Sequence, residues 1–157
     1  METIIKRVTI VDPLGPHHGK CKDVLVQDGT IQAIEDTIEA PHSAEVWSEE
    51  GAHLSIGWMD LQADFGDPGN EQKEGLENGL NAAAAGGFAH VLLNVSQVPV
   101  PDNKAAIAYL RSRSHGFQTA LLPMGTVSKG RLGQELAELY DLADAGAIAF
   151  SDDAPID

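Results

Sequence analysis

The sequence predicts an α/β protein in which a short all-β segment precedes a parallel sheet with helices. Two observations favour this fold class. Over residues 1–55, β-branched residues are frequent and apolar residues alternate with polar ones, as is typical of short strands. Over residues 56–157, short apolar runs alternate with segments of helical period. We therefore expect a β module over residues 1–55 and a β/α region over residues 56–157.

The β module carries one specific turn signal. The segment 23–36, DVLVQDGTIQAIED, is typical of two short strands on either side of Asp28 and Gly29. An Asp-Gly pair between alternating residues predicts a tight hairpin, because both central residues of that turn adopt a positive φ.

Four apolar runs recur through the β/α region at intervals of about thirty residues, and helical segments separate them. Strand and helix in alternation at a constant spacing predict βαβ units and therefore a parallel sheet. The runs cover residues 58–65, 88–95, 117–127 and 147–153.

Three helices are predicted between these runs. The first lies within residues 71–87 and ends at the Gly86-Gly87 pair, which is typical of a helix C-terminus. The second lies within residues 101–116, and Asp102 is its expected N-cap. The third lies within residues 131–146 and ends at Gly146. Its expected buried face consists of Leu132, Leu136, Leu139 and Ala143.

A parallel sheet of this kind is either an open doubly wound sheet or a (β/α)8 barrel. No glycine-rich phosphate turn follows the first run, which disfavours the dinucleotide-binding form of the open sheet. Four strands make half of a barrel, and an open parallel edge is costly. We therefore expect the chain to be a piece of a longer protein.

The composition excludes several classes of function. A formal charge of −14 argues against a nucleic-acid partner, because such binding requires clustered Lys and Arg. No apolar run approaches the length of a membrane span, and the first residues lack a signal-peptide pattern. The single cysteine, Cys21, cannot form an internal disulfide. We expect a cytoplasmic protein that binds neither nucleic acid nor membrane.

Two stretches resemble the dihydroorotases of the amidohydrolase superfamily. They are residues 57–103, which include MDLQADFGDPG and AAAAGGF, and residues 122–154, which include FSDDA. The resemblance covers essentially the whole chain. It implies a (β/α)8 barrel of which this chain holds the first four βα units, with the N-terminal strands forming part of a β-sandwich. It also implies hydrolysis or closure of dihydroorotate, a cyclic amide of pyrimidine biosynthesis, with zinc as cofactor.

The chain departs from the family where the chemistry is expected. Gln62 and Asp64 stand where the family has its two zinc-binding histidines, and a neutral amide is a poor zinc ligand. Gly66 replaces the arginine, and Ser96 the asparagine, that hold the substrate in the family. An aspartate pair that the family uses at a later strand end persists as Asp152 and Asp153, and we assign the metal-bridging role to Asp153.

Two functions remain open at this point. The first is a dihydroorotase-like protein without catalysis or metal, which acts as a structural or regulatory partner. Some family members that lack the metal ligands assemble with aspartate transcarbamoylase, so the resemblance implies such a partner or a homodimer. The second is an active cyclic amidohydrolase in which Asp64 and Asp153 contribute to an oxygen-rich site for Mg²⁺ or Mn²⁺.

Overall fold

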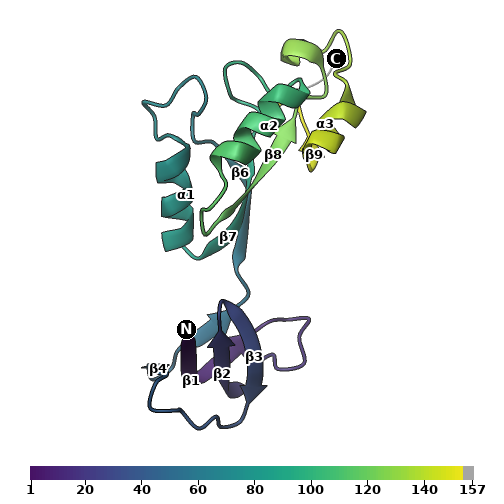
Figure 1. The fold of residues 1–157 in the computed structure, drawn as a ribbon. Helices are drawn as coiled ribbons and strands as arrows, with labels where there is room; N and C mark the ends of the chain where they lie inside the picture. Colours follow the sequence, from purple (N-terminus) through teal and green to yellow (C-terminus); the bar gives the residue numbers. More distant parts are fainter. Residues whose placement is uncertain (154–157) are drawn as a thin grey trace. The chain divides into compact units, whose positions relative to one another are not determined.

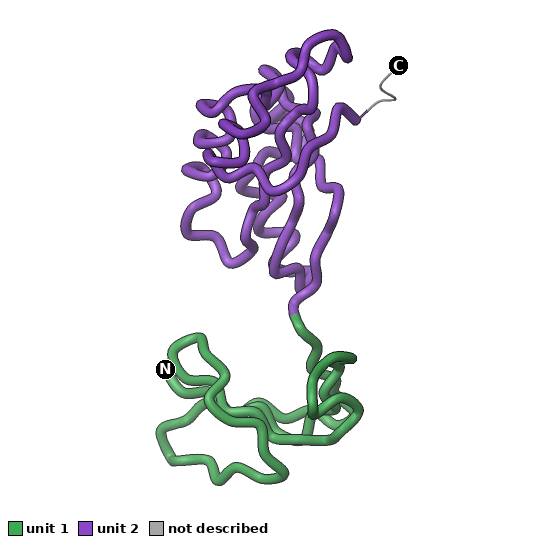
Figure 2. Tube along the Cα trace, turned by 90° about the vertical axis from the view of Figure 1, so that its right-hand side faces the viewer, with its two compact units in different colours: residues 1–56 green, residues 57–157 purple. Residues whose placement is uncertain are grey.

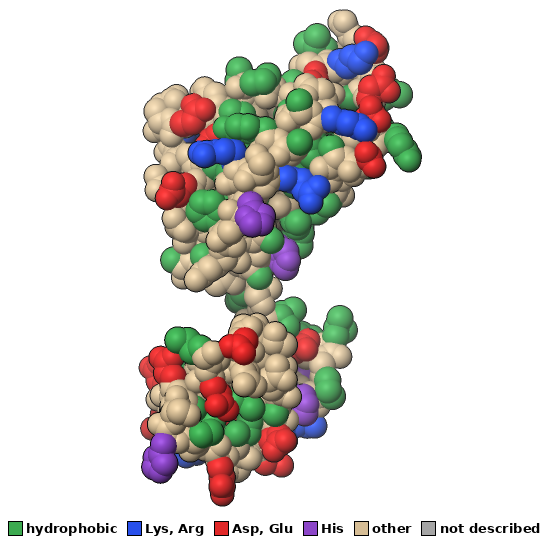
Figure 3. Space-filling view, viewed as in Figure 1, with side chains coloured by type: hydrophobic (Ala, Val, Ile, Leu, Met, Phe, Trp, Pro, Cys, Tyr) green, Lys and Arg blue, Asp and Glu red, His purple; other side chains and the backbone are tan. Residues whose placement is uncertain are grey.

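The computed structural model describes residues 1–153 and divides the chain into two compact units (Figure 2). Unit 1 is Met1–Ile56, and unit 2 starts at Gly57. No helix among the described residues has the length and apolar character needed to cross a membrane. On the face shown in Figure 3, the Lys and Arg side chains are dispersed among acidic ones and form no continuous basic patch.

Unit 1 is a single five-stranded sheet in the order β3-β2-β1-β4, with β5 also paired to β1. The hairpin between β2 and β3 turns at Asp28 (φ 49°) and Gly29 (φ 77°), which confirms the predicted Asp-Gly turn. Val8, Ile10 and Val24 form the buried core on one face of the sheet. The strands are β1 (Glu2–Val11), β2 (Cys21–Gln27), β3 (Thr30–Glu35), β4 (Glu45–Ser48) and β5 (His53–Ser55).

Asp23 of β2 organises the polar contacts of unit 1. Its side chain accepts hydrogen bonds from the backbone N–H groups of Arg7 and Ile38 and from Lys6 Nζ, each at 2.9 Å. Burial alone would raise the pKa of this carboxyl group. The hydrogen bonds from Ile38, Lys6 and Arg7 outweigh burial and hold the pKa of Asp23 below its ordinary value of 3.8.

Unit 2 is a parallel sheet in the order β6-β7-β8-β9, with helices between successive strands (Figure 1). The predicted alternation of strand and helix is therefore confirmed. The strands are β6 (Trp58–Ala63), β7 (Phe88–Leu93), β8 (Ala120–Gly125) and β9 (Ala149–Phe150). The helices are α1 (Leu76–Ala85), α2 (Lys104–Arg113), the short 3-10 helix η1 (Lys129–Arg131) and α3 (Leu139–Ala145).

The core of unit 2 lies between the sheet and its first two helices. Leu76 and Leu80 of α1 and Leu110 of α2 pack in one buried cluster with Val91 and Leu93 of β7. Burial of such side chains is the main favourable term for folding, at about 25 cal/mol per Å² of apolar surface. The cluster holds the strands in register and so positions the loops that follow them.

The C-terminal end of α1 agrees with the prediction from the sequence, whereas the N-cap of α2 differs from it. Helix α1 ends at Gly86, and Gly87 adopts the left-handed conformation (φ 82°), as predicted. Asp102, however, is not the N-cap of α2. Asn103 caps that helix by accepting a hydrogen bond from the Ala106 N–H at 3.1 Å, while Asp102 accepts one from the Gly130 N–H at 3.0 Å.

The third helix is shorter than predicted, and its buried face is different. Helix α3 starts at Leu139 because the preceding segment contains left-handed residues at Gly130, Arg131 and Gly133, which interrupt a regular helix. Leu142 is the fully buried residue of α3. Leu132, Leu136 and Ala143 are exposed, and only Leu139 of the predicted face packs on the core.

We predict that Asp23→Ala lowers the free energy of unfolding by about 2–3 kcal/mol, because it leaves two N–H donors and Lys6 without their acceptor. The folded-state pKa of Asp23 is depressed, so its contribution is present above the unfolded value of 3.8 and is lost as the pH falls below it. Urea unfolding between pH 7 and pH 3 measures both effects.

The matched control for Asp23 is Asp36→Ala, which removes an ion pair with Lys22 (2.6 Å) whose carboxylate is 91% exposed. We expect this control to leave stability nearly unchanged, because water screens an exposed pair. An equal loss in both variants would contradict the assignment of Asp23 as the organising carboxylate.

Candidate functional site

The candidate site lies where the parallel strands of unit 2 end. Neighbouring parallel strands bring the side chains that follow them to one edge of the sheet, which is where barrel enzymes place their chemistry. A cavity of about 180 Å³ lies at this edge. It is lined by Leu61, Gln62, Asn94, Val95, Met124, Ser151 and Asp153. Two of the candidate metal positions, Gln62 and Asp153, therefore face the same space.

Gln62 and Asp153 bind each other directly. Gln62 Nε2 donates to Asp153 Oδ1 at 3.3 Å. The second oxygen, Asp153 Oδ2, lies 3.6 Å from Nη2 of Arg131. Asp153 itself adopts a left-handed φ of 52°. Both carboxylate oxygens of Asp153 are thus engaged by protein groups, one by a neutral amide and one by a cation.

Arg131 is a residue of this site that the sequence did not identify. Its Nε donates to the carbonyl oxygen of Asp152 at 2.9 Å, and its Nη1 donates to that of Val95 at 3.1 Å. The guanidinium group therefore connects the loops after β7 and β9. Its position in the loop after β8 was a usable signal, because in a barrel such loops converge on the same face.

Asp64 lies at the end of β6 in a separate hydrogen-bonded group. Its Oδ1 accepts from the Ser96 hydroxyl at 2.7 Å and from the Gly66 N–H at 3.0 Å, and Lys73 Nζ lies 3.9 Å from Oδ2. The hydrogen bond from Ser96 is the main cause that holds the pKa of Asp64 below its ordinary value; Gly66 and Lys73 act in the same direction and burial opposes them.

The hydroxyl of Ser96 has two acceptors within reach. It lies 2.7 Å from Asp64 Oδ1 and 2.7 Å from Asn94 Oδ1, and one hydroxyl hydrogen can serve only one of them fully. The structure therefore brings the candidate substrate residue Ser96 to the candidate metal residue Asp64, and each uses the other as a partner.

Asp152 has a different environment from Asp153. It is only 4% exposed, and it accepts hydrogen bonds from the backbone N–H groups of Val127 and Ser128 at 2.9 and 3.0 Å and from the Ser128 hydroxyl at 2.6 Å. Burial raises its pKa, but the bonds from Ser128 and Val127 outweigh burial and lower it. Asp152 does not line the strand-end cavity and instead anchors the loop after β8.

Gly66 occupies a position that admits no side chain in this conformation. Its φ is +69°, a region that L residues rarely adopt. A Cβ atom placed there would lie 2.5 Å from the carbonyl oxygen of Asn70 and 3.3 Å from Lys73 Cβ. The loop after β6 therefore leaves no room at this position for the arginine side chain that the resemblance implies.

The residues of this site do not fit zinc. Structural and catalytic zinc sites use three or four ligands from Cys, His, Asp and Glu. Within residues 1–153 there is no group of three or more such side chains that could hold a metal ion. Asp64 and Asp153 are bound to different partners, and Arg131 places a positive charge beside Asp153.

Comparison with known families decides the identity of the fold. A family model described as dihydro-orotase-like matches residues 51–155. The chain belongs to the dihydroorotase-like family. This dihydroorotase-like chain is 36% identical over 155 residues to a dihydroorotase of Aquifex aeolicus, covering 98% of this chain and 36% of that relative. It is 40% identical over 131 residues to a dihydroorotase of Carboxydothermus hydrogenoformans, covering 83% and 30%.

Solved structures agree on the fold. An L-hydantoinase (dihydropyrimidinase) from Arthrobacter aurescens aligns with a TM-score of 0.76 at 20% identity, over 94% of this chain and 32% of its own. A dihydroorotase aligns with a TM-score of 0.64 at 14% identity, over 95% and 41%. The dihydroorotase-like chain therefore shares its fold with the matched parts of these two structures. It spans about a third of the length of these relatives.

We predict different roles for the two neighbouring aspartates. Asp152→Ala should lower the free energy of unfolding by about 2–3 kcal/mol, because the part-buried Val127 N–H and the buried Ser128 N–H lose their acceptor. Asp153→Ala should cost less than about 1 kcal/mol, because its contacts are partly exposed. Equilibrium denaturation of both variants measures the difference, and equal losses would contradict the assigned roles.

We also predict that replacing Gly66 by alanine destabilises the protein more than the same change at Gly133, a glycine with a similar φ. Gly133→Ala, at φ +67° with no atom within 4 Å of the added Cβ, should cost roughly 1 kcal/mol of backbone strain. Gly66→Ala, at φ +69°, should cost about 2 kcal/mol more, because its Cβ meets Asn70. Thermal unfolding of the pair tests this, and similar melting temperatures would show that the Gly66 loop adapts.

Proposed function

We propose that this protein is a dihydroorotase-like member of the pyrimidine pathway that has lost the catalytic metal and acts as a structural or regulatory partner. The supporting observation is that the strand-end side chains bind one another. Gln62 binds Asp153, Asp153 also faces Arg131, and Asp64 binds Ser96. Groups that would hold a metal and a substrate in an active site here serve as each other's partners.

The chemistry of cyclic amide hydrolysis explains why this pairing matters. Attack on an unactivated amide requires a polarised carbonyl and a hydroxide formed near neutral pH, and a bound metal supplies both. Gln62 contributes a neutral amide at the position of an expected imidazole, and Gly66 contributes no charge for a substrate carboxylate. We therefore propose that activation of the amide and positioning of the substrate have been lost together.

We also propose which parts of the family fold the two units correspond to. The sheet β6-β7-β8-β9 corresponds to the first half of a (β/α)8 barrel, and unit 1 to part of a β-sandwich. Within residues 1–153, β6 pairs only with β7, and its Met59 and Leu61 side chains are exposed. Exposed apolar residues on an edge strand favour further pairing. A closed barrel supplies a strand at that edge.

An active cyclic amidohydrolase with an oxygen-rich metal site would use Asp64 and Asp153 together. The structure gives these carboxylates separate partners, Ser96 for Asp64 and Gln62 with Arg131 for Asp153. No contact among the described residues favours this second function. It is therefore the alternative that the experiment must distinguish.

Metal content and turnover test the proposal. We would equilibrate the purified protein with Zn²⁺, Mn²⁺ or Mg²⁺, remove free metal by gel filtration, and measure bound metal and dihydroorotate hydrolysis. We expect clearly substoichiometric metal and no turnover above a metal-free control. Stoichiometric metal that is lost in Asp64→Ala, together with turnover, would contradict the proposal and support the active enzyme.

A gain-of-ligand variant sharpens this test. The double variant Gln62→His and Asp64→His restores two imidazoles on one strand face. We expect it to retain more zinc than the parent but to remain inactive, because Gly66 and Arg131 are unchanged. Turnover in this variant would show that the metal ligands are the only defect.

Assembly tests the partner role. We would mix the protein with aspartate transcarbamoylase from the same source and follow sedimentation velocity and carbamoyl transfer. A faster-sedimenting complex with altered transferase activity supports the regulatory role, whereas independent sedimentation at micromolar concentration argues against it.

A further inference from the structure

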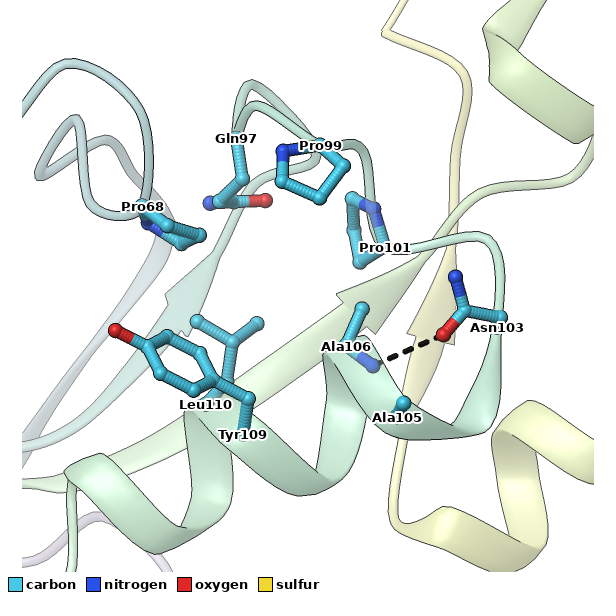
Figure 4. Close-up of a pocket in the computed structure, with 9 residues that line it drawn as sticks. All are labelled: Pro68, Gln97, Pro99, Pro101, Asn103, Ala105, Ala106, Tyr109 and Leu110. Atoms are coloured by element: carbon cyan, nitrogen blue, oxygen red, sulfur yellow. Dashed lines mark hydrogen bonds between the residues drawn. The ribbon is translucent and has the colours of Figure 1, made fainter.

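Two further cavities lie outside the strand-end site, and they differ in charge. The first, in unit 2, has a volume of about 290 Å³, and Pro68, Pro99, Pro101 and Tyr109 line it (Figure 4). Among the described residues, no Asp, Glu, Lys, Arg or His side chain lines this cavity. The second, in unit 1, has a volume of about 360 Å³ and is lined by three charged residues. This second cavity, which we call the charged cavity, therefore offers specific partners to a ligand.

The charged cavity lies between the strands β1 and β2 and the loop that follows β4. Arg7 and Thr9 of β1, Cys21 of β2 and the segment 48–51 line it. The loop is held against β1, because the Thr9 N–H donates to the carbonyl oxygen of Ala52 at 2.9 Å. Backbone contacts therefore fix the position of the loop that carries two of the three charges.

Arg7 stands at an irregularity of β1. The register between β1 and β2 shifts between Ile5 and Val8, and Arg7 adopts a left-handed φ of 54°. Its N–H donates to Asp23 Oδ1 at 2.9 Å, which holds the backbone in this conformation. Glycine adopts such a φ without strain, whereas arginine does not. Bulges redirect side chains, and residues in strained backbone conformations cluster at functional sites, so an arginine at this position indicates a role for its side chain.

The charges of the cavity are not paired with each other. Arg7, Glu49 and Glu50 all line it, and all three residues are exposed to solvent. Among residues 1–153, Arg7 forms no ion pair with a carboxylate, and neither glutamate forms one with a cation. A ligand can therefore reach these groups and replace the water that hydrates them.

The signs of these charges restrict the ligand. An arginine binds a carboxylate through two parallel N–H···O bonds, and a glutamate carboxylate binds an ammonium group. A simple anion would meet the two glutamates, and a simple cation would meet Arg7. A small zwitterion that carries both a carboxylate and an ammonium group matches both kinds of partner. The volume of about 360 Å³ lies within the range of about 300–1,000 Å³ that is typical of small-ligand sites.

We propose that the charged cavity binds a free α-amino acid. The carboxylate of the amino acid pairs with the guanidinium group of Arg7, and its ammonium group pairs with Glu49 and Glu50. Because these protein groups are exposed, water and salt weaken their ion pairs, and the affinity is in the millimolar range at low salt. The site lies within unit 1 and is independent of the strand-end groups and of the function proposed for them.

Cys21 gives a direct readout of occupancy, because it lines the charged cavity, is exposed and is the only cysteine of the chain. We would measure its alkylation by iodoacetamide, a neutral reagent, with increasing L-alanine, propionate or ethylamine at low salt. We expect L-alanine to slow alkylation with a midpoint in the millimolar range. Propionate lacks the ammonium group and ethylamine lacks the carboxylate, so each should require about tenfold higher concentrations. No protection by L-alanine, or equal protection by all three compounds, would overturn the proposal.

A matched pair of substitutions tests the carboxylate partner. Arg7→Gln removes the charge but keeps the backbone N–H that binds Asp23, and Arg113→Gln makes the same change at an exposed position of α2 outside the cavity. The alkylation rate of each variant without ligand serves as its reference. We expect Arg7→Gln to weaken protection by L-alanine about tenfold and Arg113→Gln to leave it unchanged. Unchanged protection in Arg7→Gln would refute the assigned pairing.

The double variant Glu49→Gln and Glu50→Gln tests the ammonium partner. We expect it to weaken protection by L-alanine and by ethylamine about tenfold, because both lose their anionic partners. Propionate should protect Cys21 at least as well as before, since it no longer meets two negative charges. An unchanged midpoint for L-alanine, or an equal loss for all three compounds, would contradict the proposed site.

Discussion

The parallel pairing of β6, β7, β8 and β9 is the constraint on which the rest of unit 2 depends. Parallel strands must end at one edge, and the loops that follow them must share that edge. Polar residues placed there by the sequence therefore meet whether or not they perform chemistry. In this protein they form hydrogen bonds with each other, and those bonds hold the loops in place.

This constraint is compatible with the proposed loss of the reaction, because the parallel sheet does not need the chemistry at its edge in order to fold. Asp64 follows β6, and hydrogen bonds from Ser96 and Gly66 stabilise its charge. Asp153 remains after β9, and Arg131 provides a positive charge beside it. A buried or partly buried carboxylate needs such compensation, and here a cation and a set of hydrogen bonds supply it.

The fold was largely predictable because its signals are periodic or local. The Asp28-Gly29 hairpin and the strand–helix alternation follow from turn chemistry and spacing. The start of α3 and the N-cap of α2 were not predictable, because both depend on tertiary contacts. Left-handed residues at 130, 131 and 133 precede α3, and Asn103 rather than Asp102 caps α2. Arg131 was not identified from the sequence, because its partners, the carbonyl oxygens of Val95 and Asp152, lie far from it along the chain.

The ionisation of Asp64 tests the central claim, that protein groups have taken the place of the metal, most directly. Carboxyl ¹³C NMR of the labelled protein, with and without Zn²⁺, gives the pKa of this group. The account predicts a pKa below the ordinary 3.8, a rise in Ser96→Ala, and no change on adding Zn²⁺. A resonance of Asp64 that shifts stoichiometrically with Zn²⁺ would contradict it.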